Sequence, residues 1–254
     1  MRLEPKPLGD CGISVSPLSL GTVKLGRNTA VKYPSTFSLP SDEEVISLLE
    51  MAREFGINLI DTAPAYGTSE ERLGRLLPGL RKDWVICTKA GETFVDGQSI
   101  YDFSRSAIES SVRQSLHNLR TDYLDVVLIH SDGRDLEILN ETDAMQTLQK
   151  LKDEGLVRLI GISTKTVEGG FSALDVSDVL MVTLNLKDQT QLPLIRAAEE
   201  RGCGILVKKA MASGHGDATA NLKFSLSTPG VGSVVLGTIN PDHLKQNVET
   251  ALAL

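Results

Sequence analysis

The sequence predicts an α/β protein in which eight parallel strands close into a (β/α)8 TIM barrel, preceded by a short β-hairpin. Three observations lead to this prediction. Eight short apolar segments rich in β-branched residues recur along the chain, helical patterns separate them, and 254 residues match the size of one such barrel. We therefore expect residues 1–254 to form a single domain.

The eight candidate strands are too short and too rich in β-branched residues to be helices. In chain order they occupy residues 18–22, 57–62, 84–89, 123–130, 157–163, 179–185, 204–209 and 231–238. The segment before them, residues 2–17, contains two brief extended pieces near Gly9 and Gly12. These pieces predict a small hairpin that covers the bottom of the barrel.

Helical patterns lie between the strands, at residues 41–56, 69–77, 105–119, 141–155, 192–202 and 241–252. The first begins at Ser41, a favourable N-cap, and reaches Gly56, a favourable C-terminal cap. Segments 165–178 and 214–230 are weaker helices because of their Gly and Ser content. An open doubly wound sheet is the alternative fold. In that fold a G-x-G-x-x-G turn usually follows the first strand, and this sequence has no such turn after residues 18–22.

Composition and charge narrow the class of function. A net charge of -7 argues against a nucleic-acid or membrane-surface partner. Cys11, Cys87 and Cys203 form no C-x-x-C pair, so neither a disulfide framework nor a metal site is expected. No apolar run reaches the ~18 residues of a membrane span, and the start lacks a signal region. We expect a monomeric, cytoplasmic protein.

Ionisable residues end three consecutive strands, which are Asp61 on the second, Lys89 on the third and His130 on the fourth, and Tyr66 follows Asp61 closely. Catalytic groups of such barrels lie at the carboxyl ends of the strands. Alternation along each strand places five apolar residues on the same inward side, namely Leu59, Val85, Cys87, Val126 and Leu128. Each polar group is therefore expected at the barrel mouth, above an apolar column.

Each of these four residues alone has a simpler structural explanation, such as a turn aspartate, a solvated lysine, a buried imidazole or a packed ring. Four complementary groups at one mouth favour a site instead. Asp61 can pair with the Lys89 ammonium, and that ammonium would lower the pKa of the Tyr66 phenol from its usual ~10.

A phenol tuned in this way is a general acid for a carbonyl oxygen, and His130 can donate a hydrogen bond to the same oxygen. No side chain provides a hydride, so carbonyl reduction would require a nicotinamide or flavin cofactor.

The stretch "DTAPAYGTSEERLG", residues 61–74, resembles the D-T-A-x-x-Y-G-x-S-E-x-x-L-G signature of the aldo-keto reductases. Further similar segments follow the family's order, namely "LGDCGISVSPLSLGTVKLG", "ICTK", "YLDVVLIH", "LKDEGLVRLIGIS" and "VVLGTINPDHLKQNVE". The resemblance implies a (β/α)8 barrel and NAD(P)H-dependent carbonyl reduction. It also implies a catalytic tetrad of Asp61, Tyr66, Lys89 and His130, with Tyr66 as the acid.

The same resemblance implies positions that contact the cofactor. They are Gly21 and Thr22 near the nicotinamide, Ser163 and Thr164 at its carboxamide, and Gly237, Thr238, Asn240, His243 and Asn247 after the eighth strand. Asn240 as N-cap and Pro241 behind it start a helix whose free N–H groups suit an anion. The resemblance implies NADPH as the cofactor. NADH is the alternative, because His243 stands where an arginine usually binds the 2′-phosphate of NADPH.

Three positions on the sixth and seventh strands depart from the family pattern. Met181 stands where a glutamine is frequent, and Lys208 and Lys209 replace a Tyr-Ser pair whose ring stacks on the nicotinamide. A lysine could instead approach the cofactor amide or phosphates as a point charge, or one of the two could be a solvated strand-end residue.

The leading hypothesis is a reductase of small aldehydes or ketones. The segment after His130 reads as a short loop, and the chain ends soon after the eighth helix, which predicts an open pocket. One alternative is a dinucleotide-binding sensor or regulatory barrel with little turnover. Another is a lyase that uses Lys89 as a Schiff base, although Tyr66 would then have no role.

Overall fold

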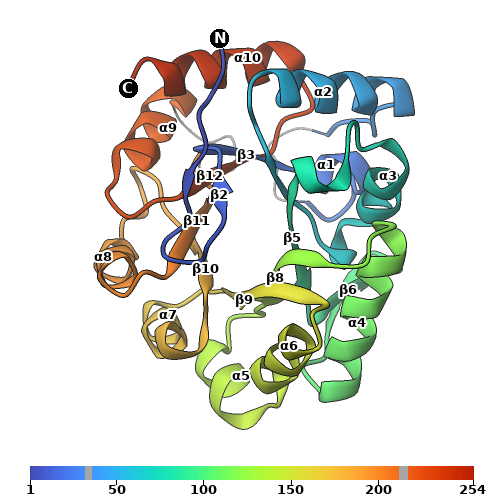
Figure 1. Ribbon diagram of the computed structural model, residues 1–254, viewed down its shortest axis with the longest axis vertical. Helices are drawn as coiled ribbons and strands as arrows, with labels where there is room; N and C mark the ends of the chain where they lie inside the picture. Colours follow the sequence, from blue (N-terminus) through green and yellow to red (C-terminus); the bar gives the residue numbers. More distant parts are fainter. Residues whose placement is uncertain (32–35, 212–216) are drawn as a thin grey trace.

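A computed structural model of the chain, which describes residues 1–31, 36–211 and 217–254, confirms the closed parallel barrel (Figure 1). Neighbouring strands pair in parallel around the ring, and the last pairs with the first. The barrel strands in ring order are β3 (Leu18–Gly21), β4 (Leu59–Asp61), β5 (Val85–Ala90), β8 (Leu124–His130), β9 (Val157–Ser163), β10 (Val179–Thr183), β11 (Gly204–Lys208) and β12 (Ser233–Leu236).

Helices surround the barrel in Figure 1. The α-helices are α1 (Val23–Gly26), α2 (Asp42–Glu54), α3 (Ser69–Leu76), α4 (Arg105–Asn118), α5 (Asp135–Glu141), α6 (Ala144–Asp153), α7 (Val167–Ala173), α8 (Leu192–Glu200), α9 (Ala218–Ser227) and α10 (Pro241–Leu252). Short 3-10 turns are η1 (Pro64–Tyr66), η2 (Arg81–Asp83) and η3 (Leu174–Val176).

The weaker helical segments contain real helices. Segment 165–178 holds α7 and η3, and 214–230 holds α9, although residues 214–216 of that prediction lie outside the described residues. The loop predicted after His130 is wrong, because α5 begins at Asp135. The buried Asp135 carboxylate accepts hydrogen bonds from the N–H groups of Lys165 and Thr166, which ties the start of this helix to the segment that follows β9.

The predicted N-terminal hairpin is present as β1 (Lys6–Pro7) and β2 (Ser14–Val15), and its Leu8 and Val15 are buried with the residues that fill the barrel. A second hairpin, β6 (Glu92–Val95) and β7 (Gln98–Tyr101), was not predicted. It lies between β5 and α4 and turns at Asp96 and Gly97, both with positive φ (50° and 81°), as two-residue hairpin turns require.

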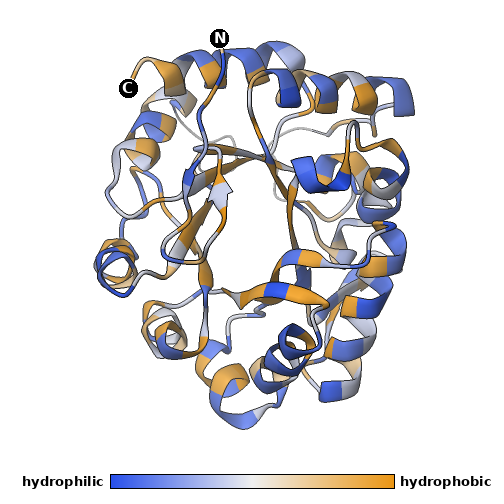
Figure 2. Ribbon diagram, in the orientation of Figure 1, coloured by the Kyte–Doolittle hydropathy of each residue, from blue (hydrophilic) through white to orange (hydrophobic). Residues whose placement is uncertain are grey.

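The barrel interior is apolar, as the strand alternation predicts. Leu59, Cys87, Val126 and Leu128 are fully buried in one cluster, with Val85 packed against it. The larger cluster contains the outward residues of the strands and the helix residues packed over them, and Figure 2 shows apolar strands within helices of mixed hydropathy. Polar side chains at the strand ends therefore stand on a filled core.

Two helix ends match their sequence signals. The Ser41 side chain accepts a hydrogen bond from Glu44 N, and the Glu44 carboxylate accepts one from Ser41 N, which makes a complete capping box. Gly56 follows the end of α2 with a φ of 81°, the left-handed conformation that favours glycine at this position.

A pair of glycines fixes the turn that carries Tyr66. Gly67 has a φ of 62°, and a Cβ placed on it would lie 2.2 Å from the carbonyl oxygen of Gly26. A Cβ on Gly26 would in turn lie 2.4 Å from the carbonyl oxygen of Tyr66. The backbones of the α1 segment and of the turn at η1 therefore lie in direct contact, which helps to set the position of Tyr66.

We expect Gly67→Ala to lower the free energy of unfolding by more than about 2 kcal/mol, because it adds a backbone clash to the strain of positive φ. Gly155→Ala is the matched control, since Gly155 has a φ of 79° with no atom within 4 Å of the added Cβ. That variant should cost only ~1 kcal/mol. Urea unfolding measures both, and equal losses would contradict the close contact.

Candidate active site

The structure brings the four predicted catalytic residues together at the carboxyl ends of the strands. Asp61 ends β4, Lys89 lies one residue before the end of β5, and His130 ends β8. Tyr66 ends η1, and its ring centroid lies 4.9 Å from Lys89 Nζ. The Tyr66 and His130 rings meet edge to face, with centroids 6.2 Å apart and planes at 83°.

A buried ion pair joins the first two of these residues. Lys89 Nζ donates to Asp61 Oδ1 at 2.6 Å and to the Thr62 carbonyl oxygen at 2.9 Å. Burial alone would lower the pKa of the Lys89 ammonium, but Asp61, with smaller contributions from Tyr66 and Cys87, opposes burial and the pKa is raised. The lysine therefore stays a cation directly beside the Tyr66 ring.

Thr22 ties the ends of β3 and β4 to α3. Its backbone N–H and its hydroxyl both donate to the Asp61 carbonyl oxygen, at 3.0 Å and 2.9 Å. The Ser69 hydroxyl donates to the Thr22 hydroxyl at 2.8 Å. The Thr22 side chain, expected near the cofactor, is fully buried and already engaged in holding the Asp61 backbone.

Glu92 is a residue of the site that the sequence prediction missed. Its Oε2 lies 2.6 Å from Nδ1 of His130, and its side chain is 7% exposed. Burial raises the pKa of the Glu92 carboxyl, but the hydrogen bond with His130 leads the opposing contacts that lower it to about 2. The Asp96-Gly97 turn between β-compatible segments was the one available sequence signal for the hairpin that carries Glu92.

The surroundings of the His130 ring favour its neutral form, because they lower the pKa of the imidazolium. Burial lowers the pKa of its imidazolium, and the Glu92 hydrogen bond and charge only partly oppose this effect. The cations of Lys89 and Lys208 lower it further.

Lys208, and not Lys209, reaches across the mouth towards β9. Lys208 Nζ donates to Ser163 Oγ at 2.7 Å and to the Thr164 carbonyl oxygen at 2.8 Å. Burial, followed by the charges of Lys209 and Lys89, lowers the pKa of Lys208 to about 7. Lys209 has a φ of 56° and is exposed beyond the strand end.

The ends of β9 and β11 suit the carboxamide of a nicotinamide ring, which offers one acceptor oxygen and two N–H donors. Ser163 Oγ and Lys208 Nζ are polar groups at this place. Thr164 Oγ1 is buried and has no hydrogen-bond partner within the described residues. The donor and acceptor set therefore fits the carboxamide of the cofactor that the sequence implies.

The expected cofactor residues after β12 lie at the surface. Gly237, Asn240 and His243 are exposed, and Thr238 and Asn247 are half-buried. Asn240 Oδ1 caps α10 by accepting from the N–H groups of Asp242 and His243, at 2.8 Å and 3.3 Å. These two N–H groups, expected to be free for an anion, are therefore already engaged in the structure.

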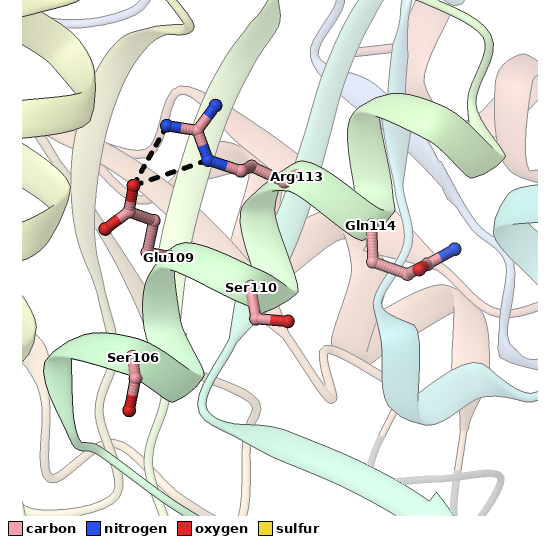
Figure 3. A pocket seen from close by; sticks show the side chains of 5 residues that line it. All are labelled: Ser106, Glu109, Ser110, Arg113 and Gln114. Atoms are coloured by element: carbon pink, nitrogen blue, oxygen red, sulfur yellow. Dashed lines mark hydrogen bonds and ion pairs between the residues drawn. The ribbon is translucent and has the colours of Figure 1, made fainter.

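A surface pocket elsewhere carries no comparable chemistry. Figure 3 shows it on the outer face of α4, lined by Ser106, Glu109, Ser110, Arg113 and Gln114. Its shortest charged contact is the Glu109–Arg113 pair at 2.9 Å, one helical turn apart and partly exposed to solvent. The strand ends are therefore the candidate site.

Two further findings concern residues 1–31, 36–211 and 217–254 alone. No helix among them is long and apolar enough to cross a membrane. These ranges also contain no cluster of three or more His, Cys, Asp or Glu side chains that could hold a metal ion.

Comparisons with known proteins agree with this geometry. A family model described as "Aldo/keto reductase family" matches residues 17–219. A putative aldo-keto reductase structure from Pseudomonas aeruginosa is 50% identical, with a TM-score of 0.91, covering 98% of this chain and 94% of its own. A holo-form aldo-keto reductase from Bacillus halodurans, 24% identical over 100% of this chain and 92% of its own, shares the fold with a TM-score of 0.85.

A curated relative is the L-galactose dehydrogenase of Arabidopsis thaliana. It is 31% identical over 227 residues, which cover 84% of this chain and 67% of the relative.

We expect the Asp61–Lys89 pair to be strongly coupled. Asp61→Asn or Lys89→Met alone leaves one buried charge without its partner, so each should cost about 3–5 kcal/mol of unfolding free energy. The double variant should cost clearly less than the sum. The exposed pair of Asp175 and Arg201, 83% and 51% exposed, is the control, and Asp175→Asn should cost under ~1 kcal/mol. Additive losses in urea unfolding would contradict the pairing.

The lowered pKa of Lys208 predicts a pH dependence of stability. Between about 7 and the ordinary lysine value of ~10.4, the unfolded chain binds more protons at this group than the folded protein does. The contribution of Lys208 to stability therefore rises with pH across this window. As the pH rises through this window, the unfolding free energy of wild type should increase relative to that of Lys208→Met. The exposed control Lys223→Met should show the same pH dependence as wild type. Parallel curves for wild type and Lys208→Met would rule out a buried, shifted amine.

Proposed function

Because this chain belongs to the aldo/keto reductase family of NAD(P)-dependent oxidoreductases, we propose that it reduces small aldehydes or ketones to alcohols with NADPH. The observation that carries this proposal is the grouping of Asp61, Lys89, Tyr66 and His130 at one barrel mouth. The bound nicotinamide would supply the hydride, and the chain must supply the proton.

Tyr66 is proposed to deliver that proton to the carbonyl oxygen. The Lys89 ammonium, 4.9 Å from the ring centroid, favours the phenolate that remains after the proton has left. Asp61 holds this ammonium in place and takes no part in the proton transfer itself. A phenol beside a fixed cation is a usable general acid near neutral pH.

Cofactor binding is proposed to use Ser163, Thr164 and Lys208 at the nicotinamide end, beside Gly21 and Thr22. The residues after β12, namely Gly237, Thr238, Asn240, His243 and Asn247, would face the adenosine end. NADPH is favoured by the family resemblance and by Lys245 close to His243 in the chain, and NADH remains the alternative. Comparing the dissociation constants of the two cofactors tests this choice.

A second candidate is oxidation of a sugar, because the Arabidopsis relative bears the name L-galactose dehydrogenase. The same proton site serves this reverse direction, in which Tyr66 would accept the proton of the hydroxyl group. Incubation with NAD⁺ or NADP⁺ and L-galactose tests it directly. We further propose a monomeric cytoplasmic enzyme, consistent with its three free cysteines.

We expect Tyr66→Phe to lower kcat/KM for aldehyde reduction by at least ~100-fold, since it removes the general acid and keeps the ring. NADPH affinity, followed by cofactor fluorescence, should stay within about threefold of wild type. Tyr123→Phe is the matched control, because that ring packs between Arg81 and Arg158 away from the mouth. Unchanged turnover in Tyr66→Phe would overturn this mechanism, and wild type without any turnover would favour the sensor alternative.

A further inference from the structure

We propose that Glu92 is a positioning residue that fixes the tautomer of His130, so that the neutral ring carries its hydrogen on Nδ1 and offers an acceptor at Nε2. The inference starts from one contact, the 2.6 Å between Glu92 Oε2 and His130 Nδ1. Two lone pairs at this distance would repel each other, so a hydrogen must lie between them. Since Glu92 is a carboxylate, the ring nitrogen has to carry it.

The exposure of the ring leaves Nε2 as the nitrogen for a ligand. Nδ1 is buried, and the Glu92 carboxylate lies 2.6 Å from it. The His130 side chain is nevertheless 20% exposed, so its exposed surface belongs to other atoms. A substrate or the Tyr66 hydroxyl can therefore meet the ring only at a side other than Nδ1.

Glu92 is held where it is by the hairpin and by Arg27. Strand β6 packs against η1, and Glu92 pairs in register with Tyr101 of β7. The Arg27 guanidinium carbon lies 3.4 Å from the Phe94 ring centroid, and Arg27 Nη1 donates to the Ala65 carbonyl oxygen at 3.0 Å. The hairpin is thus held against the turn that carries Tyr66. Glu92 and Tyr66, which both contact His130, are therefore positioned together.

What the tautomer of His130 means for the reaction rests on the proposed function, whereas the tautomer itself is independent of that function. A neutral His130 with its hydrogen on Nδ1 cannot donate from Nε2 to a carbonyl oxygen, contrary to the role expected from the sequence. It accepts a hydrogen bond instead, from Tyr66 or from an alcohol substrate. Donation to a carbonyl oxygen requires the imidazolium, in which both nitrogens carry hydrogens.

Charged and titratable groups on five elements face His130 or its partner. Glu92 on β6 stabilises the imidazolium, whereas Lys89 on β5 and Lys208 on β11 destabilise it. Tyr66 on η1 meets the ring at its edge. Behind Glu92, Ser99 and Tyr101 of β7 hydrogen-bond to its carboxylate, and Arg27 lies within its electrostatic reach.

The direct test is the tautomer of His130 in cofactor-free protein. Long-range proton–nitrogen NMR of protein labelled with nitrogen-15 in its four histidines distinguishes the two neutral forms, and His130→Gln assigns the signal. We expect a neutral His130 with the hydrogen on Nδ1. A hydrogen found on Nε2 in wild type overturns the proposal, whatever the enzyme does to substrates.

Glu92→Gln keeps the size of the side chain and removes the charge. Its amide can donate to Nδ1, so the Nε2–H form should become populated and His130 should titrate at lower pH, because the carboxylate raises its pKa. Glu137→Gln, an exposed carboxylate on α5, is the control and should change neither. Unchanged His117 and His243 signals report an intact fold, and an unchanged His130 tautomer and titration in Glu92→Gln contradict the proposal.

Kinetics give the second readout. If reduction uses the imidazolium, kcat/KM falls as pH rises through the pKa of His130, and Glu92→Gln moves this fall to lower pH. A purely structural role for Glu92 would lower activity at every pH alike, and that result overturns the positioning role. Absence of any turnover, together with the expected tautomer, would refute only the proposed function.

Discussion

The ion pair between Asp61 and Lys89 is the interaction on which the site depends. Both side chains are almost fully buried, 5% and 1% exposed, above an apolar barrel interior. Charges in such a place persist only when they are paired and hydrogen-bonded. The pair therefore fixes the ammonium position, and the glycine contacts between α1 and η1 fix the Tyr66 turn beside it.

Around this pair, the mouth holds its polar groups in two opposed sets. On one side Tyr66, His130 and Glu92 lie together beside the β6–β7 hairpin, where we propose that the proton is delivered. Across the ring, Lys208 bridges β11 to β9 in the place where the family resemblance implies a stacking ring. A cation in this position could interact with polar cofactor atoms but could not supply the contact of a stacked ring, so we propose that the cofactor is held differently here.

The sequence was sufficient to predict the barrel and to place Asp61, Lys89 and His130 at strand ends, because both follow from local signals. Strand periodicity located all eight strands, and alternation within each strand correctly placed Leu59, Cys87 and Leu128 inside. Glu92 was missed because its partner His130 comes from another strand, and no local pattern encodes that contact. The engagement of Thr22 with Asp61 and Ser69 likewise exists only after β3, β4 and α3 have met.

Single-turnover kinetics of Asp61→Asn show whether the buried pair supports proton delivery by Tyr66. Wild type and variant would be loaded with NADPH and mixed with 4-nitrobenzaldehyde in a stopped-flow instrument. The variant should still bind NADPH but oxidise it at least about tenfold more slowly, because the Lys89 ammonium has lost its carboxylate partner. Equal rates of NADPH oxidation in the two proteins would mean that proton delivery does not depend on the pair.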